Sequence, residues 1–167
     1  MNTRFLTGAL FAAALVLTGC ATRNKMPLEN DADRITEQSK PVFLMSATIK
    51  NTYRTSYQPK MIVVHVEKPD AKESADRLNF TMGDKGRDEK NSAAAGNSYL
   101  TRMELPAGSY VIRGFSSIAS SFPVNAFFFT PMHADLEVKN GGVYYLGHVT
   151  ATVRERPVSY THLTLPT

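Results

Sequence analysis

Hydrophobic and polar side chains alternate along most of the chain from residue 41 onward. In residues 42–51 an apolar side chain occupies every second position: Phe43, Met45, Ala47 and Ile49. A period of two is typical of a strand with one buried face, and β-branched and aromatic residues favour strands. By the same reasoning we expect strands at residues 61–67, 78–82, 99–105, 109–115, 127–129, 134–138 and 143–154.

This series of strands predicts an all-β domain over residues 41–157. Strands separated by frequent turn residues, without a helix of ten or more residues, favour an antiparallel β-sandwich of about seven or eight strands. Two turns are expected to close hairpins, Pro106-Ala107-Gly108 and Gly141-Gly142. The polar stretch at 68–97 is long for a sandwich loop, and it leaves the strand count open.

Residues 1–19 have the parts of an export signal. Arg4 supplies positive charge, residues 5–16 are apolar, and Leu-Thr-Gly leads directly into Cys20, the single cysteine of the chain. The apolar run is too short to span a bilayer, which takes about 20 residues. The sequence Leu-Thr-Gly-Cys resembles the lipobox of bacterial lipoprotein precursors. An ordinary export signal that happens to precede a cysteine is the alternative.

The lipobox resemblance implies that the signal is cut before Cys20 and that this residue carries acyl chains. Several chains anchor a protein stably, because each buried CH₂ contributes about 0.8 kcal/mol. Ala21 rather than Asp follows the cysteine, which in that family implies sorting to the outer membrane, facing the periplasm. Residues 20–40 are polar with mixed charge, so we expect a flexible tether there.

The last ten residues, 158–167, resemble one reading frame of a sequencing-library adapter rather than natural protein. We therefore exclude them from all reasoning about fold and site. The natural sequence is expected to diverge from this one near Pro157.

Two sequence motifs resemble those of known β-sandwich domains. Residues 105–110, Leu-Pro-Ala-Gly-Ser-Tyr, are similar to a hairpin of transthyretin-like and carboxypeptidase-regulatory-like domains. Residues 141–147, Gly-Gly-Val-Tyr-Tyr-Leu-Gly, resemble the closing strand of bacterial lipoproteins with such domains. The resemblance implies an Ig-like or transthyretin-like sandwich. It implies little about function, because one fold hosts many activities.

Composition and charge exclude several classes of function. Hydrophobic residues make up 43% of the chain and charged residues 20%, which suits a single core. Nineteen basic and fifteen acidic residues leave a net charge of +4. This excess is small and scattered, so no nucleic-acid partner is expected. A single cysteine excludes an internal disulfide.

The sequence contains no recognisable catalytic or metal-binding motif. His65, His133 and His148 are too far apart in sequence to form a helical or hairpin metal pair. The acidic segment 84–89 lacks the spacing of a calcium loop, and its Lys and Arg residues neutralise it. We expect no cofactor, no metal and no catalytic residue. A site assembled from these histidines in three dimensions stays open as the alternative.

Three consecutive aromatic residues, Phe127, Phe128 and Phe129, are the candidate contact with a partner. Side chains alternate along a strand, so Phe128 must face the side opposite to its two neighbours. We favour burial of this strand on both faces over exposure. If the aromatic residues are exposed, they would contact an envelope protein or lipid.

The sequence as a whole predicts a lipid-anchored envelope protein. Its β-sandwich is expected to be a non-catalytic binding or accessory module on the periplasmic side of the outer membrane. The expected partners are membrane lipid, through acylated Cys20, and another envelope protein. Two alternatives stay open: a periplasmic hydrolase or metal-dependent enzyme, and a carrier of a small ligand, which needs a large apolar cavity.

Overall fold

The structure is a computed structural model that describes residues 22–26, 40–139 and 141–155. In this part of the chain the elements are strands and one short 3₁₀ helix: β1 (Thr22–Lys25), β2 (Val42–Asn51), β3 (Lys60–Glu67), η1 (Ser74–Asp76), β4 (Arg77–Thr81), β5 (Arg87–Ser92), β6 (Gly96–Glu104), β7 (Gly108–Ser121), β8 (Val124–Val138) and β9 (Val143–Val153). No helix of the described residues is long and apolar enough to cross a membrane.

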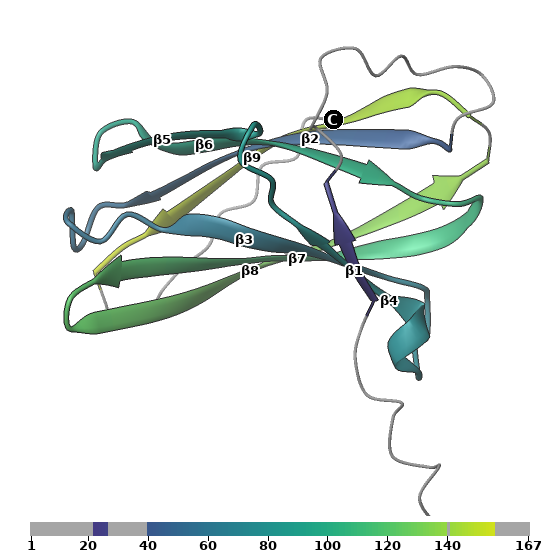
Figure 1. Ribbon diagram of the computed structural model, residues 1–167, viewed down its shortest axis with the longest axis horizontal. Coiled ribbons are helices and arrows are strands. Elements are labelled where there is room, and N and C mark those ends of the chain that lie inside the picture. Colours follow the sequence, from purple (N-terminus) through teal and green to yellow (C-terminus); the bar gives the residue numbers. More distant parts are fainter. Residues whose placement is uncertain (1–21, 27–39, 140, 156–167) are drawn as a thin grey trace, which may run out of the picture.

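The strands form two sheets that lie face to face as two layers (Figure 1). Sheet A has the order β1-β4-β3-β7-β8, and sheet B has the order β5-β6-β2-β9. The prediction of an all-β sandwich is therefore confirmed. The described residues contain nine strands rather than seven or eight. β1 and β5 were not expected from the sequence, and the two strands expected at 127–129 and 134–138 form the single strand β8.

Both sheets are mixed, which corrects the expectation of a purely antiparallel sandwich. β1 runs parallel to β4, and β9 runs parallel to β2. Neither parallel pair joins strands that are consecutive in the chain, so no tight turn forces the two strands to run in opposite directions. All other neighbours pair antiparallel.

The two predicted hairpins are wrong, because each of their turns connects one sheet to the other. The segment from Leu105 to Gly108 leads from β6 in sheet B to β7 in sheet A. The Gly141-Gly142 segment likewise leads from β8 in sheet A to β9 in sheet B. Gly108 has a positive φ of 147°, and Leu105 is fully buried. The long hairpin of the molecule is β7–β8, which turns at Phe122 and Pro123.

The expected tether of residues 20–40 needs a correction at its beginning. Thr22–Lys25 form β1 beside Leu78–Thr81 of β4. The next residue, Met26, is 1% exposed and belongs to the core, and its N–H donates to the carbonyl of Thr81 at 3.2 Å. Backbone pairing with an existing sheet edge orders this polar stretch, which could not fold alone. Residues 27–39, Cys20 and the adapter-like tail lie outside the described residues.

The core lies between the two sheets and follows the alternation of the sequence. Strand β2 has the bounds expected for it, and its buried face is the predicted one, with Phe43, Met45, Ala47 and Ile49 at most 4% exposed. In β3 a register shift between Met61 and Val63 turns both Met61 and Val64 inward. A bulge of this kind adds one residue and changes the face of those after it.

Candidate functional site

The aromatic segment of β8 is exposed rather than buried on both faces. Phe127 is 74% exposed and Phe129 is 54% exposed on the outer face of sheet A, whereas Phe128 is half-buried on the inner side. The predicted alternation is thus confirmed, and the expected burial of all three is wrong. Near the turn, Phe122 is 99% exposed and Val124 is 48% exposed.

The position of β8 in the sheet explains this exposure. β8 is the edge strand of sheet A among the described residues, and Phe127 lies opposite Ile118 of β7 in the register of this sheet. Residues 114–134 contain no Lys, Arg, Asp or Glu. The apolar end of the β7–β8 hairpin, residues 118–129, is called the aromatic end below. Exposed apolar clusters of this kind mark interaction sites.

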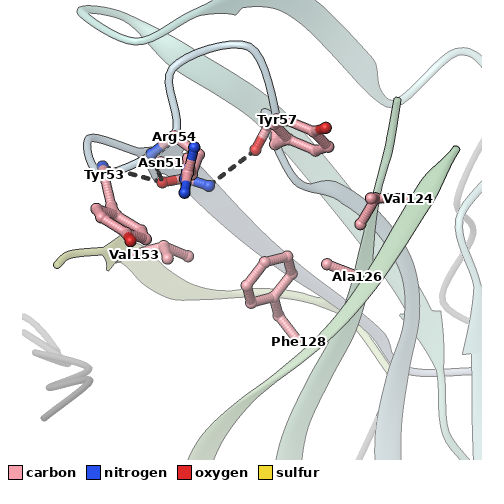
Figure 2. A pocket seen from close by; sticks show the side chains of 8 residues that line it. All are labelled: Asn51, Tyr53, Arg54, Tyr57, Val124, Ala126, Phe128 and Val153. Carbon is pink, nitrogen blue, oxygen red and sulfur yellow. Dashed lines mark hydrogen bonds between the residues drawn. The ribbon is translucent and has the colours of Figure 1, made fainter. Parts of the chain in front are cut away.

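A pocket of about 450 Å³ lies beside the aromatic end, between the edges of the two sheets. Its walls are Val124, Ala126 and Phe128 from β8, with Val153 at the end of β9 and two tyrosines from the loop after β2, Tyr53 and Tyr57. Figure 2 shows the Phe128 ring directed toward the space enclosed by these residues. Phe128 therefore faces a cavity rather than the close-packed core.

Two buried polar residues hold the loop that forms one wall of this pocket. Asn51 is 3% exposed and Gln58 is 5% exposed. The N–H of Asn51 donates to Oε1 of Gln58 at 2.9 Å, and Nε2 of Gln58 donates to the carbonyl of Asn51 at 2.9 Å. Such reciprocal bonds satisfy the buried groups and fix the loop.

The side chain of Asn51 shapes the same loop from within (Figure 2). Its Oδ1 accepts from the N–H groups of Tyr53 at 3.0 Å and Arg54 at 2.9 Å, and its Nδ2 donates to the carbonyl of Tyr57 at 3.0 Å. The Arg54 guanidinium lies 5.2 Å from the centre of the Tyr53 ring. The pocket is thus an apolar space with one cation among its lining residues.

A second group of polar side chains lies on the outer face of sheet A. His65 on β3 bonds two neighbouring strands: its Nδ1 lies 2.8 Å from Oδ1 of Asn79 on β4, and its Nε2 lies 2.7 Å from Oγ of Ser116 on β7. The ring of Phe129 is 5.9 Å from the His65 ring, measured between centroids. His65 thus links β4, β3 and β7 through its side chain.

Charged side chains surround this histidine group. Glu67 accepts from Nε of Arg113 at 3.0 Å, and Nε of Arg77 lies 4.0 Å from its other oxygen. These three residues line a shallow pocket of about 350 Å³ together with His65, Asn79, Ser116 and Phe129. Two guanidinium groups and one carboxylate leave one positive charge beside His65.

The three histidines do not assemble into a metal site. His148 contacts Ser46 on sheet B, with 2.9 Å between Nδ1 and Oγ, and His133 lies 3.4 Å from Arg113. Within the described ranges no three His, Cys, Asp or Glu side chains form a group that could hold a metal. The alternative of a site shared by His65, His133 and His148 is therefore wrong.

The acidic segment at 84–89 forms ion pairs instead of an open cation site. Glu89 accepts from Lys60 at 3.0 Å, from Arg87 at 2.9 Å and from the Tyr99 hydroxyl at 3.1 Å. Burial alone would raise the pKa of Glu89, but these hydrogen bonds hold it below its usual value. Burial also raises the pKa of Tyr99, which stays protonated as the donor.

Sequence reasoning missed both the pocket and the histidine group. Tyr53 and Tyr57 follow β2 in a polar loop with no recognisable motif, and Asn79 and Ser116 stand 14 and 51 positions from His65. A sheet that brings distant strands together leaves no regular spacing in the chain.

Comparison with protein families, curated proteins and solved structures finds no match for this chain.

Proposed function

We propose that this protein is a lipid-anchored protein of the bacterial cell envelope whose sandwich binds a partner protein at its aromatic end. The anchor is acylated Cys20, and Ala21 favours the periplasmic face of the outer membrane. At the aromatic end the sandwich acts as a binding module without catalysis. The Leu-Thr-Gly-Cys lipobox supports the anchor, and the exposed aromatic end supports the binding.

The observation that carries the binding role is the concentration of exposed apolar side chains on one hairpin. Among the described residues nine large hydrophobic side chains are exposed. Four of them lie in the β7–β8 hairpin: Phe122, Val124, Phe127 and Phe129. Aromatic anchors beside a pocket are typical of the centre of protein interfaces, because both partners exclude water there.

The position of β1 favours a protein partner over lipid. β1 begins two residues after Cys20. In the register of sheet A, Thr22 of β1 lies in the same row across β4 and β3 as Ile112 of β7. From Ile112 the hairpin continues for nine more residues to Ser121, which is about 30 Å at 3.3 Å per residue. An anchor at Cys20 would thus hold one end of the sheet near the bilayer and leave the aromatic end free to reach a neighbour.

The anchor and the interface can be tested separately in bacterial cells. A Cys20→Ser variant is expected to lose labelling by a clickable fatty acid and to leave the membrane fraction. A photoreactive benzoylphenylalanine in place of Phe127 is expected to crosslink to one discrete partner. The same group in place of Leu100, which is 42% exposed on sheet B, serves as the control and should not form this adduct.

A second substitution makes the crosslinking result specific to the aromatic end. Val124→Asp places a charge at the rim of the pocket, so it should abolish the Phe127 adduct without changing the membrane fraction. Equal crosslinking from positions 127 and 100, or an adduct that tolerates Val124→Asp, would contradict the proposed interface. Retained fatty-acid label in Cys20→Ser would contradict the proposed anchor.

A second candidate function is the carriage of a small apolar ligand. The observation that favours it is the pocket of about 450 Å³ with Arg54 among its lining residues, a size in the range of ligand sites. Phe128→Trp would fill this space. Loss of binding of a fluorescent fatty acid in that variant, with the Phe127 crosslink unchanged, would separate this function from the proposed interface.

A further inference from the structure

The hydrogen bonds of His65 connect a hydroxyl, an imidazole and an amide in a row. Ser116 Oγ lies 2.7 Å from Nε2 of His65, and Asn79 Oδ1 lies 2.8 Å from Nδ1 of the same ring. A nucleophile within hydrogen-bond reach of a base, whose other nitrogen is held by a third group, is the arrangement that activates serine. We propose that Ser116 is a nucleophile with His65 as its general base and Asn79 as a positioning residue.

The amide of Asn79 defines the tautomer that this role requires. An amide oxygen accepts only, so Nδ1 of His65 carries the proton and Nε2 presents its lone pair to the Ser116 hydroxyl. All three side chains are partly exposed from three adjacent strands. The hydroxyl is therefore hydrogen-bonded to a base, and Ser116 lines the pocket of about 350 Å³.

A second serine–histidine pair in the molecule provides an internal comparison. On the outer face of sheet B, Oγ of Ser46 lies 2.9 Å from Nδ1 of His148 and 2.7 Å from the hydroxyl of Tyr145. No side chain of the described residues holds the other nitrogen of His148. Ser46, like Ser116, contacts a histidine, but no residue positions that histidine as Asn79 positions His65. Ser46 is therefore the matched control for Ser116.

The surroundings of Ser116 indicate the class of substrate. The two positive charges of Arg77 and Arg113 and the negative charge of Glu67 leave a net charge of one in the pocket. The exposed Phe129 ring forms an apolar side of the same pocket. A small acyl ester that carries a carboxylate on its acyl group matches both features. The guanidinium groups would bind the carboxylate, and the ring would pack against the carbon chain.

The reaction is the hydrolysis of this ester in two steps. Ser116 Oγ bonds to the acyl carbon while its proton passes to Nε2 of His65; the bond to the alcohol oxygen breaks, and the alcohol leaves with that proton. Water then attacks the acyl carbon and gives a proton to Nε2. The bond to Oγ breaks, and Ser116 takes the proton back. The products are one acid and one alcohol, and this activity would add to the binding role of the aromatic end.

The test is covalent labelling of the purified full chain by a fluorophosphonate probe. Mass spectrometry is expected to find one adduct per chain, on Ser116, and none in Ser116→Ala. Loss of a general base slows such steps by about 100-fold or more, so His65→Gln should label at least that much more slowly. Asn79→Ala should also slow labelling, and Asn79→Asp should restore it, because a carboxylate accepts the same Nδ1 proton.

Two controls separate a chemical role from a structural one. Ser46→Ala and His148→Gln should label like the original chain, and every variant should keep the circular dichroism spectrum of the folded chain at the temperature of the labelling. An absence of adduct on Ser116, or equal labelling rates in His65→Gln, overturns the nucleophile. For the substrate class, the rate in excess of that with Ser116→Ala should be higher for the p-nitrophenyl ester of hydrogen succinate than for p-nitrophenyl acetate, and equal excess rates overturn the proposed acid.

Discussion

The two faces of the β7–β8 hairpin are both rich in apolar residues, yet they differ completely in burial. On the inner face Phe115, Ser117 and Ala119 are fully buried, whereas on the outer face Phe127 and Phe129 are more than half exposed. The inner face packs against sheet B, and no described element covers the outer face (Figure 1). Hydrophobic content alone therefore does not identify the core side of a strand.

The largest expected effect of this difference is on stability. Phe115→Ala removes a fully buried ring between the sheets, which costs about 3–5 kcal/mol through lost burial and a cavity. Phe127→Ala, on the outer face, should stay within about 0.5 kcal/mol of the original chain. Urea unfolding measures both free energies. Similar losses in the two variants would mean that an additional element covers the outer face.

An intermediate effect is expected at Phe128, which faces the pocket rather than the close-packed core. Phe128 is half-buried, so Phe128→Ser should cost about 2 kcal/mol, half of the loss at a fully buried ring. Phe129→Ser, on the opposite face, serves as the matched control and should be near neutral. Thermal unfolding of the two variants compares them directly. A neutral Phe128→Ser would show that the ring contributes nothing to the sandwich.

The all-β class and the main core face could be predicted because an alternation of apolar and polar residues arises when one face of a strand is buried. Strand β2 was expected with its observed bounds, since a single buried face imposes strict alternation. The pairing of strands could not be predicted in the same way. A turn such as Leu105 to Gly108 looks the same whether it closes a hairpin or crosses between sheets, because both strands bury one face in either case.

The strands β1 and β5 were missed because their stability does not come from apolar alternation. β5 consists of Arg-Asp-Glu-Lys-Asn-Ser, and it forms the edge of sheet B next to β6. Backbone hydrogen bonds and ion pairs such as Arg87 to Glu89, at 2.9 Å, support it. Neither strand propensity nor the hydrophobic pattern predicts such pairing at the edge of a sheet.

The candidate sites were predictable only in part. The aromatic run was recognised from composition, but its exposure depends on the edge position of β8, which is a property of the whole sheet. His65 was placed on a strand correctly, whereas its partners Asn79 and Ser116 required the register of three strands. Chemistry that is assembled across strands has no local sequence signature.

The smallest predicted effect concerns two neighbouring serines on opposite faces of β7. Ser117 is fully buried and its Oγ has no hydrogen-bond partner among the described residues, while Ser116 bonds to His65 at 2.7 Å. A buried hydroxyl without a partner destabilises the fold, so Ser117→Ala should raise the free energy of unfolding by about 1 kcal/mol. Ser116→Ala loses a hydrogen bond and should lower it by about 1 kcal/mol. Urea unfolding of both variants tests the opposite signs. A destabilising Ser117→Ala would mean that the inner hydroxyl is hydrogen-bonded after all, and the contrast between the faces would then rest on apolar packing alone.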